Sequence, residues 1–550
     1  MKNFIVENKL FLSLLILLLI LCIGTLFITT GHYSGILIDY GREVYYPQEI
    51  LNGKVLYKDL FNIYGPLSYQ INAILYKIFG AKLSTLYGAG IICSLLTVSG
   101  IYLVAQKFLS EFLSFAIGIF TIVIGITTTG VFNLHFPYSW AVVYGLIAFL
   151  YSLYFLVKFN ENKDLKNLYV SSFLAGICIT CKYDFLFYAF IILFFIIKSK
   201  NWKALLCFTF IPILSFGTLF IQGLNIIDLL NSLLTTSQMA KTKTLTYFYQ
   251  NSGIYFHPKV LLMNLICFAK TGIPFAAILS GTYLLPKNKK LAFTISSIGW
   301  ISLFYLFDVK LAFTFLPILL FVLLIYSLIK QHSAQEKNWD IIILATSVLA
   351  ICAKVFWAIL LGSYGNYYVS IALVAVFAIL FNYLPKKLEN TTTIIVIFIS
   401  LLTFLTNSMT KSSNNYKIST PKGAIYTNKA YAESSNLLIE FLNKQTTKND
   451  KVVIFPEGMI INFLADRKSD NFYNSLLPLY IETFGENKII EHFQKNKPEY
   501  IIFNNLDMKD YYFKYICQDY AFGFCEFIQN NYSLEYTIDT GFRYLIFKRK

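Results

Sequence analysis

Long runs of hydrophobic residues recur along the chain from its N-terminus to about residue 409, and then they stop. Most of the runs are long enough to cross the roughly 30 Å of hydrocarbon in a bilayer as a helix. The fifth and sixth runs are short, so they fit a re-entrant or broken hairpin as well as two spans. We predict thirteen spans, at residues 10–30, 83–105, 112–130, 139–158, 168–181, 184–197, 204–222, 259–285, 291–307, 311–330, 340–361, 369–384 and 392–409.

The pattern changes over the last 140 residues, where charged residues become frequent and long apolar runs are absent. Short apolar runs at 451–458, 499–505 and 544–548 predict buried strands, and residues 431–444 have helical spacing. The sequence therefore predicts a polytopic α-helical membrane domain at 1–409 and a small α/β domain at 410–550.

Lysines gather in alternate connections between the predicted spans, as expected for loops on the cytoplasmic side. With thirteen spans and an inside N-terminus, every cluster falls inside. Loops 31–82 and 223–258 and the C-terminal domain then lie outside a cytoplasmic (inner) membrane. The clusters are Lys2 and Lys9; Lys158, Lys163 and Lys166; Lys198, Lys200 and Lys203; Lys287, Lys289 and Lys290; Lys330 and Lys337; and Lys386 and Lys387.

Composition supports a membrane protein and argues against a nucleic-acid partner. The chain is 56% hydrophobic and 14% charged, whereas soluble domains carry about 25% charged residues. The net charge of +16 comes from lysines spread between hydrophobic runs, with no basic domain or recognition motif. No cleavable signal peptide is expected, because run 10–30 is too long and no A-x-A site follows it.

The nine cysteines form no metal-binding framework. Cys178 and Cys181 form a C-x-x-C inside a membrane run, which we interpret as two small side chains one helical turn apart. Cys517 and Cys525 lie in the C-terminal domain. They could form a disulfide if that domain faces an oxidising compartment, and the sequence leaves this open.

The loop at 31–82, after the first span, is unusually rich in acids, tyrosines and turn residues. Polar groups held at a membrane surface generally have a function. A Y-G-P-L turn would bring Asp59 and Tyr64 back toward Asp39. The residues that make this loop a candidate site are Asp39, Arg42, Glu43 and Asp59, with Pro47, Gly53, Gly65 and Pro66 as rigid turn residues.

Three patterns in this loop, Asp39-x-G-R-E-x-Y-x-Pro47, Gly53-x-x-L-Y-x-Asp59 and Tyr64-G-P-L, resemble the GT-C superfamily of membrane glycosyltransferases. That superfamily includes protein O-mannosyltransferases and aminoarabinose transferases. The resemblance implies a sugar donor carried on polyprenyl phosphate and an acid that follows the first span as general base.

Under the resemblance, Asp39 takes the acceptor's proton, Arg42 binds phosphate or orients a carboxylate, and Glu43 and Asp59 are further acids of the site. Several relatives carry a second acid in the next outer loop. Here that loop reads Asn133-L-H-F-P-Y, so His135 or Asn133 would take its place. A divalent cation is left open, because no spaced ligand motif such as H-E-x-x-H is present.

Two basic residues and two tyrosines complete the set of candidate substrate-binding residues. Lys182, in a Gly-containing segment that ends T-C-K, could meet the donor phosphate or extend to the interface. Lys354, predicted inside run 340–361, is followed by a Tyr-rich turn with Tyr367, which some relatives place near the carrier phosphate. Tyr64 of the Y-G-P-L turn is the other tyrosine.

These features predict an inverting glycosyltransferase that moves a sugar from a polyprenyl-phosphate carrier to a lipid-linked glycan, a cell-envelope polymer or a protein. A flippase of lipid-linked sugars would show repeats between chain halves, and none is evident. An O-antigen-type ligase or polymerase would put its largest outer loop late among the spans. A non-catalytic envelope glycan assembly protein is opposed only by the resemblance around Asp39.

Overall fold

The computed structural model of the chain describes residues 9–332 and 338–550, so Lys2 and Lys337 of the lysine clusters lie outside the described residues. A helix occupies each of the thirteen predicted spans. Six of these helices (α2, α5, α7, α10, α13 and α18) are long and apolar enough to cross a membrane. The thirteen are α2 Lys9–Thr29, α5 Leu83–Ala105, α6 Glu111–Ile126, α7 Trp140–Asn162, α8 Leu165–Cys181, α9 Leu186–Lys198, α10 Trp202–Ile221, α13 Pro258–Leu284, α14 Lys289–Leu306, α15 Leu316–His332, α16 Trp339–Ile351, α17 Val369–Tyr383 and α18 Lys387–Lys411.

Two predicted ranges need correction or refinement. The fifth and sixth spans form a short hairpin, in which the 3-10 turn η1 (Tyr183–Phe185) joins α8 to α9. The predicted span 340–361 is too long, because α16 ends at Ile351. Lys354 therefore lies on the 3-10 turn η2 (Ala353–Val355) beyond the helix, where its ammonium avoids the cost of burial in hydrocarbon.

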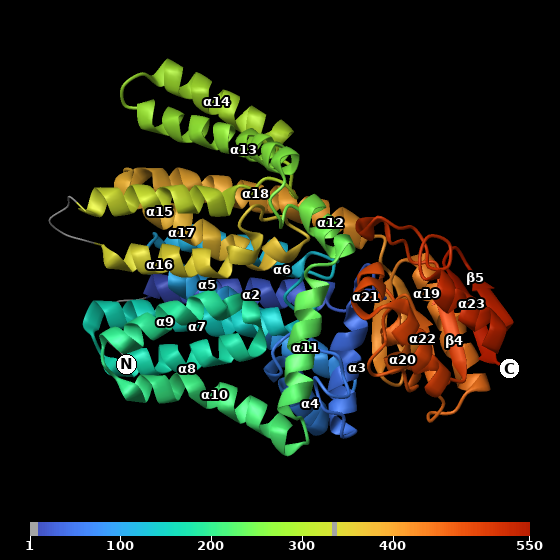
Figure 1. Cartoon of the computed structure of the whole chain (residues 1–550). Helices are drawn as coiled ribbons and strands as arrows, with labels where there is room; N and C mark the ends of the chain where they lie inside the picture. Colours follow the sequence, from blue (N-terminus) through green and yellow to red (C-terminus); the bar gives the residue numbers. More distant parts are fainter. Residues whose placement is uncertain (1–8, 333–337) are drawn as a thin grey trace.

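The helices of the membrane domain run side by side in a bundle, and the C-terminal domain covers one end of it (Figure 1). The start of α2 and the α13–α14 turn lie at the opposite end. That the lysines near these two positions lie on one side of a membrane stays a prediction. Which side faces the cytoplasm stays a prediction.

Short helices fill the two predicted outer loops. Loop 31–82 contains α3 (Tyr40–Leu51) and α4 (Leu67–Phe79), and loop 223–258 contains α11 (Ile226–Met239) and α12 (Lys243–Asn251). In Figure 1, α3, α4 and α11 cross the bundle direction between the bundle and the C-terminal domain. Pro47 was expected at a turn but lies inside α3. Packing of α3 on both sides outweighs the loss of one backbone hydrogen bond at proline.

The C-terminal domain has a four-stranded mixed sheet of order β3-β4-β6-β5 and a separate β1–β2 hairpin. Strands β3, β4 and β6 and helix α19 match the predicted elements, whereas β1, β2 and β5 were not foreseen. Cys517 and Cys525 are joined by a disulfide. The elements are β1 Tyr416–Thr420, β2 Gly423–Thr427, α19 Lys429–Gln445, β3 Val452–Phe455, α20 Met459–Ala465, α21 Pro478–Phe484, α22 Glu486–Lys495, β4 Tyr500–Asn504, η4 Lys509–Tyr511, α23 Phe522–Asn531, β5 Tyr532–Asp539 and β6 Arg543–Arg549.

The C-terminal domain is firmly docked on the first outer loop through α3. Gly41 of α3 lies so close to the start of α20 that a Cβ there would be 2.7 Å from the backbone nitrogen of Ile460. The Ser469 N–H donates to the Tyr45 hydroxyl at 2.8 Å. The β1–β2 hairpin is also bound, since the Tyr33 N–H donates to the Tyr426 carbonyl at 2.9 Å.

Candidate active site

Asp39 stands at the start of α3, at the junction of the first outer loop and the C-terminal domain. It is the residue before the helix and has φ 61°, a left-handed conformation that Asp tolerates better than most residues. Arg42 lies one turn later, so both side chains share a face of the helix. The Arg42 guanidinium nitrogen is 3.6 Å from an Asp39 carboxylate oxygen, and the Asp39 side chain is 30% exposed.

Asp39 and Arg42 line a small cavity whose walls come from both parts of the protein. The cavity encloses about 20 Å³, which is room for about one water molecule. Asp39 and Arg42 on one side therefore meet C-terminal side chains across a narrow gap. Those side chains include Glu457, Asn474, Ser475 and Tyr480.

The electrostatic setting of Asp39 suits a base. Burial raises the pKa of Asp39, while the positive charges of Arg42 and Lys182 oppose that rise. A carboxylate whose pKa is raised toward the working pH removes protons more readily, provided a cation still keeps it ionised. The Arg42 Nε donates to the Tyr69 hydroxyl at 3.0 Å, which fixes the guanidinium beside Asp39.

Glu43 does not line this cavity, although it was predicted as a second acid of the site. Its side chain is buried and both oxygens are engaged. One accepts from the Tyr69 hydroxyl at 2.8 Å, and the other accepts from the Trp140 N–H at the start of α7 at 3.1 Å. Glu43 therefore ties α3 to α4 and α7, and it holds Tyr69 where that hydroxyl meets Arg42.

A second group of charges lies on the other side of Tyr64. The Tyr64 ring lies 5.2 Å from the Arg42 guanidinium carbon and 5.1 Å from the Lys182 Nζ, both within cation–π range. Lys182 is buried, donates to the Tyr138 hydroxyl at 2.8 Å and lies 3.2 Å from Asp184. Tyr64 thus connects the Asp39 cavity to a buried ammonium.

Lys354 reaches the same group from η2. Its Nζ is 4.0 Å from the Asp184 carboxylate and 4.3 Å from the centroid of the Tyr364 ring. Asp184 therefore faces two ammonium groups. Asp184 was not among the predicted site residues. It could have been recognised as an acid two residues after Lys182, at the end of a predicted span. Burial lowers the pKa of Lys182 to about 8, which means that burying the charged ammonium costs free energy.

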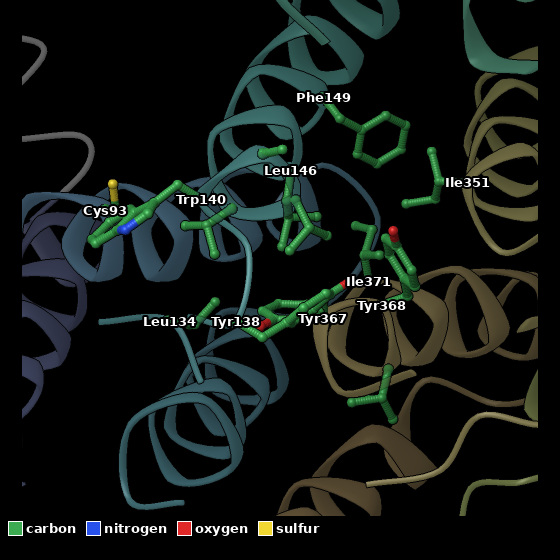
Figure 2. Close-up of a cluster of buried hydrophobic side chains, with 14 of the residues drawn as sticks. Cys93, Leu134, Tyr138, Trp140, Leu146, Phe149, Ile351, Tyr367, Tyr368 and Ile371 are labelled. Carbon is green, nitrogen blue, oxygen red and sulfur yellow. The ribbon is translucent and has the colours of Figure 1, made fainter. Parts of the chain in front are cut away.

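Tyr367 and His135 are buried nearby but do not line the Asp39 cavity. Figure 2 shows Tyr367 beside Tyr138, with ring centroids 6.0 Å apart. Tyr367 thus packs against the ring of Tyr138, whose hydroxyl accepts from Lys182. Within the described part of the chain neither ring nitrogen of His135 has a hydrogen-bond partner. Burial lowers its pKa to about 3, so the ring is neutral and lies 5.4 Å from the Tyr33 ring.

Asp59 does not line the cavity of Asp39, contrary to the expected return of the chain at the Y-G-P-L turn. Its carboxylate accepts from the Val55 N–H at 2.8 Å, so it closes its own turn. It lines a larger cavity of about 700 Å³, together with Glu49, Asp470 and His492. A catalytic role for Asp59 stays a prediction that this placement does not favour.

Among residues 9–332 and 338–550, no three His, Cys, Asp or Glu side chains gather closely enough to hold a metal ion. We therefore assign no metal ligands. Glu457 was also not among the predicted site residues; it is an acid near the end of the predicted strand 451–458 that lies just beyond the observed strand β3. That position became meaningful only when the C-terminal domain was seen against α3.

Residues 64–222 match the family model described as dolichyl-phosphate-mannose-protein mannosyltransferase. The match contains Tyr64, His135 and Lys182 but begins after Asp39. No protein of curated function matches the sequence. ArnT from Cupriavidus metallidurans, solved with undecaprenyl phosphate, has a similar fold with a TM-score of 0.50 at 9% identity, over 96% of this chain and 97% of that one.

The archaeal oligosaccharyltransferase AglB from Archaeoglobus fulgidus, solved with an inhibitory peptide and a dolichol-phosphate, aligns with a TM-score of 0.46 at 12% identity. That alignment covers 91% of this chain and 70% of AglB. The ArnT-like fold of helix bundle, crossing outer helices and C-terminal domain agrees with the family match. The chain thus has a fold like that of ArnT, and its residues 64–222 match the mannosyltransferase family model.

Proposed function

We propose that the protein is an inverting glycosyltransferase that moves a sugar from a polyprenyl-phosphate carrier to an acceptor outside the cytoplasmic membrane. The observation that carries the proposal is the pairing of Asp39 with Arg42, 3.6 Å apart, in a cavity at the end of the helix bundle. The family match and the ArnT structure with undecaprenyl phosphate support a lipid-phosphate donor.

Asp39 acts as the general base in this scheme. The acceptor's O–H or N–H gives its proton to the Asp39 carboxylate as the oxygen or nitrogen bonds to the anomeric carbon. The bond from that carbon to the phosphate oxygen breaks, and the polyprenyl phosphate leaves with the electron pair. Arg42 keeps Asp39 ionised before the transfer, and its forked donor group suits the oxygens of the leaving phosphate.

Lys182 and Lys354 bind the donor phosphate together with Arg42. Both ammonium groups face Asp184, and Tyr64 lies between Lys182 and Arg42. A phosphate entering beside Tyr64 would meet Arg42 and Lys182 at that ring, with Lys354 beside Lys182 at Asp184. These charges would stabilise the negative charge that grows on the leaving group.

The small volume of the Asp39 cavity implies that substrates bind with movement. A volume of about 20 Å³ holds one water molecule rather than a sugar. The C-terminal residues that face Asp39 must therefore move away from α3 when the donor and acceptor enter. The acceptor is a lipid-linked glycan, a cell-envelope polymer or a protein, with no role for nucleic acid.

The test is sugar transfer by purified protein in detergent, with a panel of polyprenyl-phosphate sugars and extracted envelope acceptors. We expect Asp39→Asn to lower transfer by about a hundredfold or more, as for loss of a general base. Glu161→Gln is the matched control, since it removes a carboxylate that pairs with Lys107 near the far end of α7. A parallel series with a chelator decides whether a divalent cation is needed.

Equal transfer by Asp39→Asn and wild type would refute Asp39 as the base. If wild type binds the lipid carrier but transfers no sugar from any donor, the flippase or assembly-protein function would replace the proposal. Asp59→Asn belongs in the same series, because its result decides whether the second predicted acid of this loop takes part.

A further inference from the structure

Glu457 of the C-terminal domain reaches the start of α3 from across the domain junction. It follows β3 and precedes α20, and the Asn504 amide donates to its backbone carbonyl at 2.6 Å. The next residue, Gly458, packs against Ile454, whose Cγ2 would be 2.5 Å from an added Cβ. The backbone at Glu457 is therefore held in place by the sheet behind it.

The Glu457 carboxyl group is held against the base. One oxygen accepts from the Asp39 N–H at 3.3 Å, and the other accepts from the Ser475 hydroxyl at 3.4 Å. Glu457 lines the same cavity as Asp39 and Arg42. Two carboxyl groups from opposite ends of the sequence thus share one small space.

The two acids differ in their partners. Asp39 forms an ion pair with Arg42, whereas Glu457 forms none with any Lys, Arg or His among residues 9–332 and 338–550. When two carboxyl groups lie together and one has a cation, the proton resides on the other. Burial and the neighbouring charge of Asp39 raise the pKa of Glu457 to about 8.

The other titratable groups around Glu457 do not change which of the two acids holds the proton. Arg42 is the cation nearest to the pair and favours ionised Asp39. Burial raises the pKa of each surrounding tyrosine far above neutral pH, so none of them adds charge there. These tyrosines are Tyr480 on α21, Tyr511 on η4 and Tyr520.

We propose that Glu457 is the second acid of the transfer site: in its protonated form it hydrogen-bonds the acceptor next to the group that Asp39 deprotonates. The inference rests on the proposed function and deepens it. Glu457 lines the Asp39 cavity, whereas Lys182 and Lys354, which we assign to the donor phosphate, do not, so we assign Glu457 to the acceptor. The acceptor must then carry a polar group, such as a hydroxyl or amide, beside its nucleophile.

Protonation matters because an ionised Glu457 would place a second negative charge beside Asp39. It would also lose the O–H donor. Glutamine keeps the shape and an N–H donor but cannot ionise, so it imitates the protonated acid. Alanine removes the group. Glu457→Gln therefore tests whether the protonated form is the active one, and Glu457→Ala tests whether the side chain is needed at all.

The experiment measures transfer on either side of pH 8 for wild type, Glu457→Gln and Glu457→Ala, with Asp39→Asn beside them. We expect Glu457→Gln to retain more transfer than Glu457→Ala below pH 8, because only Gln keeps a hydrogen-bond donor at this position. We also expect a smaller loss of kcat above that pH than in wild type, because Gln cannot ionise and only the contribution of Lys182 remains. We expect Ala to lower kcat/KM for the acceptor by about tenfold or more, the cost of one hydrogen bond to a substrate, with donor KM unchanged.

Two outcomes overturn the inference while leaving the proposed function intact: transfer by Glu457→Ala equal to wild type, or loss by Glu457→Gln as large as that of Asp39→Asn. Transfer by Asp39→Asn equal to wild type refutes the proposed function instead. Thermal unfolding of each variant in detergent shows whether it is folded, and the near-isosteric Gln variant keeps the test decisive if Ala is not.

An infrared titration supplies a readout that needs no substrate. We expect a carbonyl band of a protonated carboxyl group at neutral pH that is absent in Glu457→Gln. In Asp39→Asn the band should persist only to lower pH, because the charge that raises the pKa of Glu457 is gone. Absence of such a band at neutral pH overturns the inference, whatever the transfer assay gives.

Discussion

The backbone of Gly65 lies directly against the carbonyl group of Thr180 near the end of α8. The Gly65 N–H donates to the Cys181 carbonyl at 3.1 Å, and a Cβ on Gly65 would overlap the Thr180 carbonyl oxygen. The contact joins the first outer loop to the membrane bundle. It also sets Tyr64 beside Lys182, because Tyr64 directly precedes Gly65 and Lys182 directly follows Cys181.

Gly65→Ala should therefore separate Tyr64 from Lys182 as well as destabilise the fold. Because the obstructing atoms are backbone, they cannot rotate away, and overpacking of this kind costs about 1–3 kcal/mol. The measurement is thermal unfolding in detergent together with sugar transfer. Gly88→Ala is the control, since nothing lies within 4 Å of a Cβ on Gly88 in α5. If the Gly65→Ala variant were as stable and active as wild type, the contact would not be needed.

Arg42→Lys should impair transfer despite keeping the charge. Lysine has neither the planar group that lies over Tyr64 nor a second nitrogen that can reach Tyr69 while another faces Asp39. We expect kcat to fall by about tenfold or more, with normal thermal unfolding. Steady-state kinetics with the preferred donor checks this, and an unchanged kcat would mean that only the charge of Arg42 matters.

Lys182→Met should weaken binding of the donor phosphate and change its pH dependence. Burial lowers the pKa of Lys182 to about 8, so the ammonium is charged below that pH and neutral above it. Wild-type affinity for undecaprenyl phosphate should fall as pH rises through about 8. We expect Met to lower affinity by about tenfold, the value of one charge-assisted hydrogen bond, and to abolish the fall.

Titration of binding, rather than of kcat, separates Lys182 from Glu457, because only the lysine is assigned to the donor phosphate. Lys58→Met is the control: it removes an exposed lysine from the same outer loop, where its Nζ bonds the Gly223 carbonyl. Persistence of the wild-type pH dependence in Lys182→Met would show that another group binds the phosphate.

Tyr45→Phe should loosen the docking of the C-terminal domain on α3. The Tyr45 hydroxyl is the acceptor for the buried Ser469 N–H, and an unpaired buried N–H costs about 1–3 kcal/mol. Limited proteolysis and thermal unfolding should both detect the change. Tyr536→Phe provides the comparison, because Tyr536 is exposed on β5; equal effects of the two variants would contradict the role of this contact.

The hydrophobic pattern alone located the thirteen helices of the bundle, apart from the end of α16, because lipid requires each span to satisfy its own backbone hydrogen bonds. The resemblance in the first outer loop likewise pointed to the kind of fold that ArnT has and to the family whose model matches residues 64–222. The apolar strands at 451–458, 499–505 and 544–548 could also be predicted, because the pattern that indicates each strand lies in neighbouring residues.

Only the tertiary structure decided which polar side chains meet. Asp59, twenty residues from Asp39, closes its own turn, whereas Glu457, 418 residues away, accepts from the Asp39 backbone. Lys354 left its predicted helix and came within 4.0 Å of Asp184. Such contacts depend on how α3, α8 and the C-terminal domain pack against one another, and no local spacing along the chain encodes that packing.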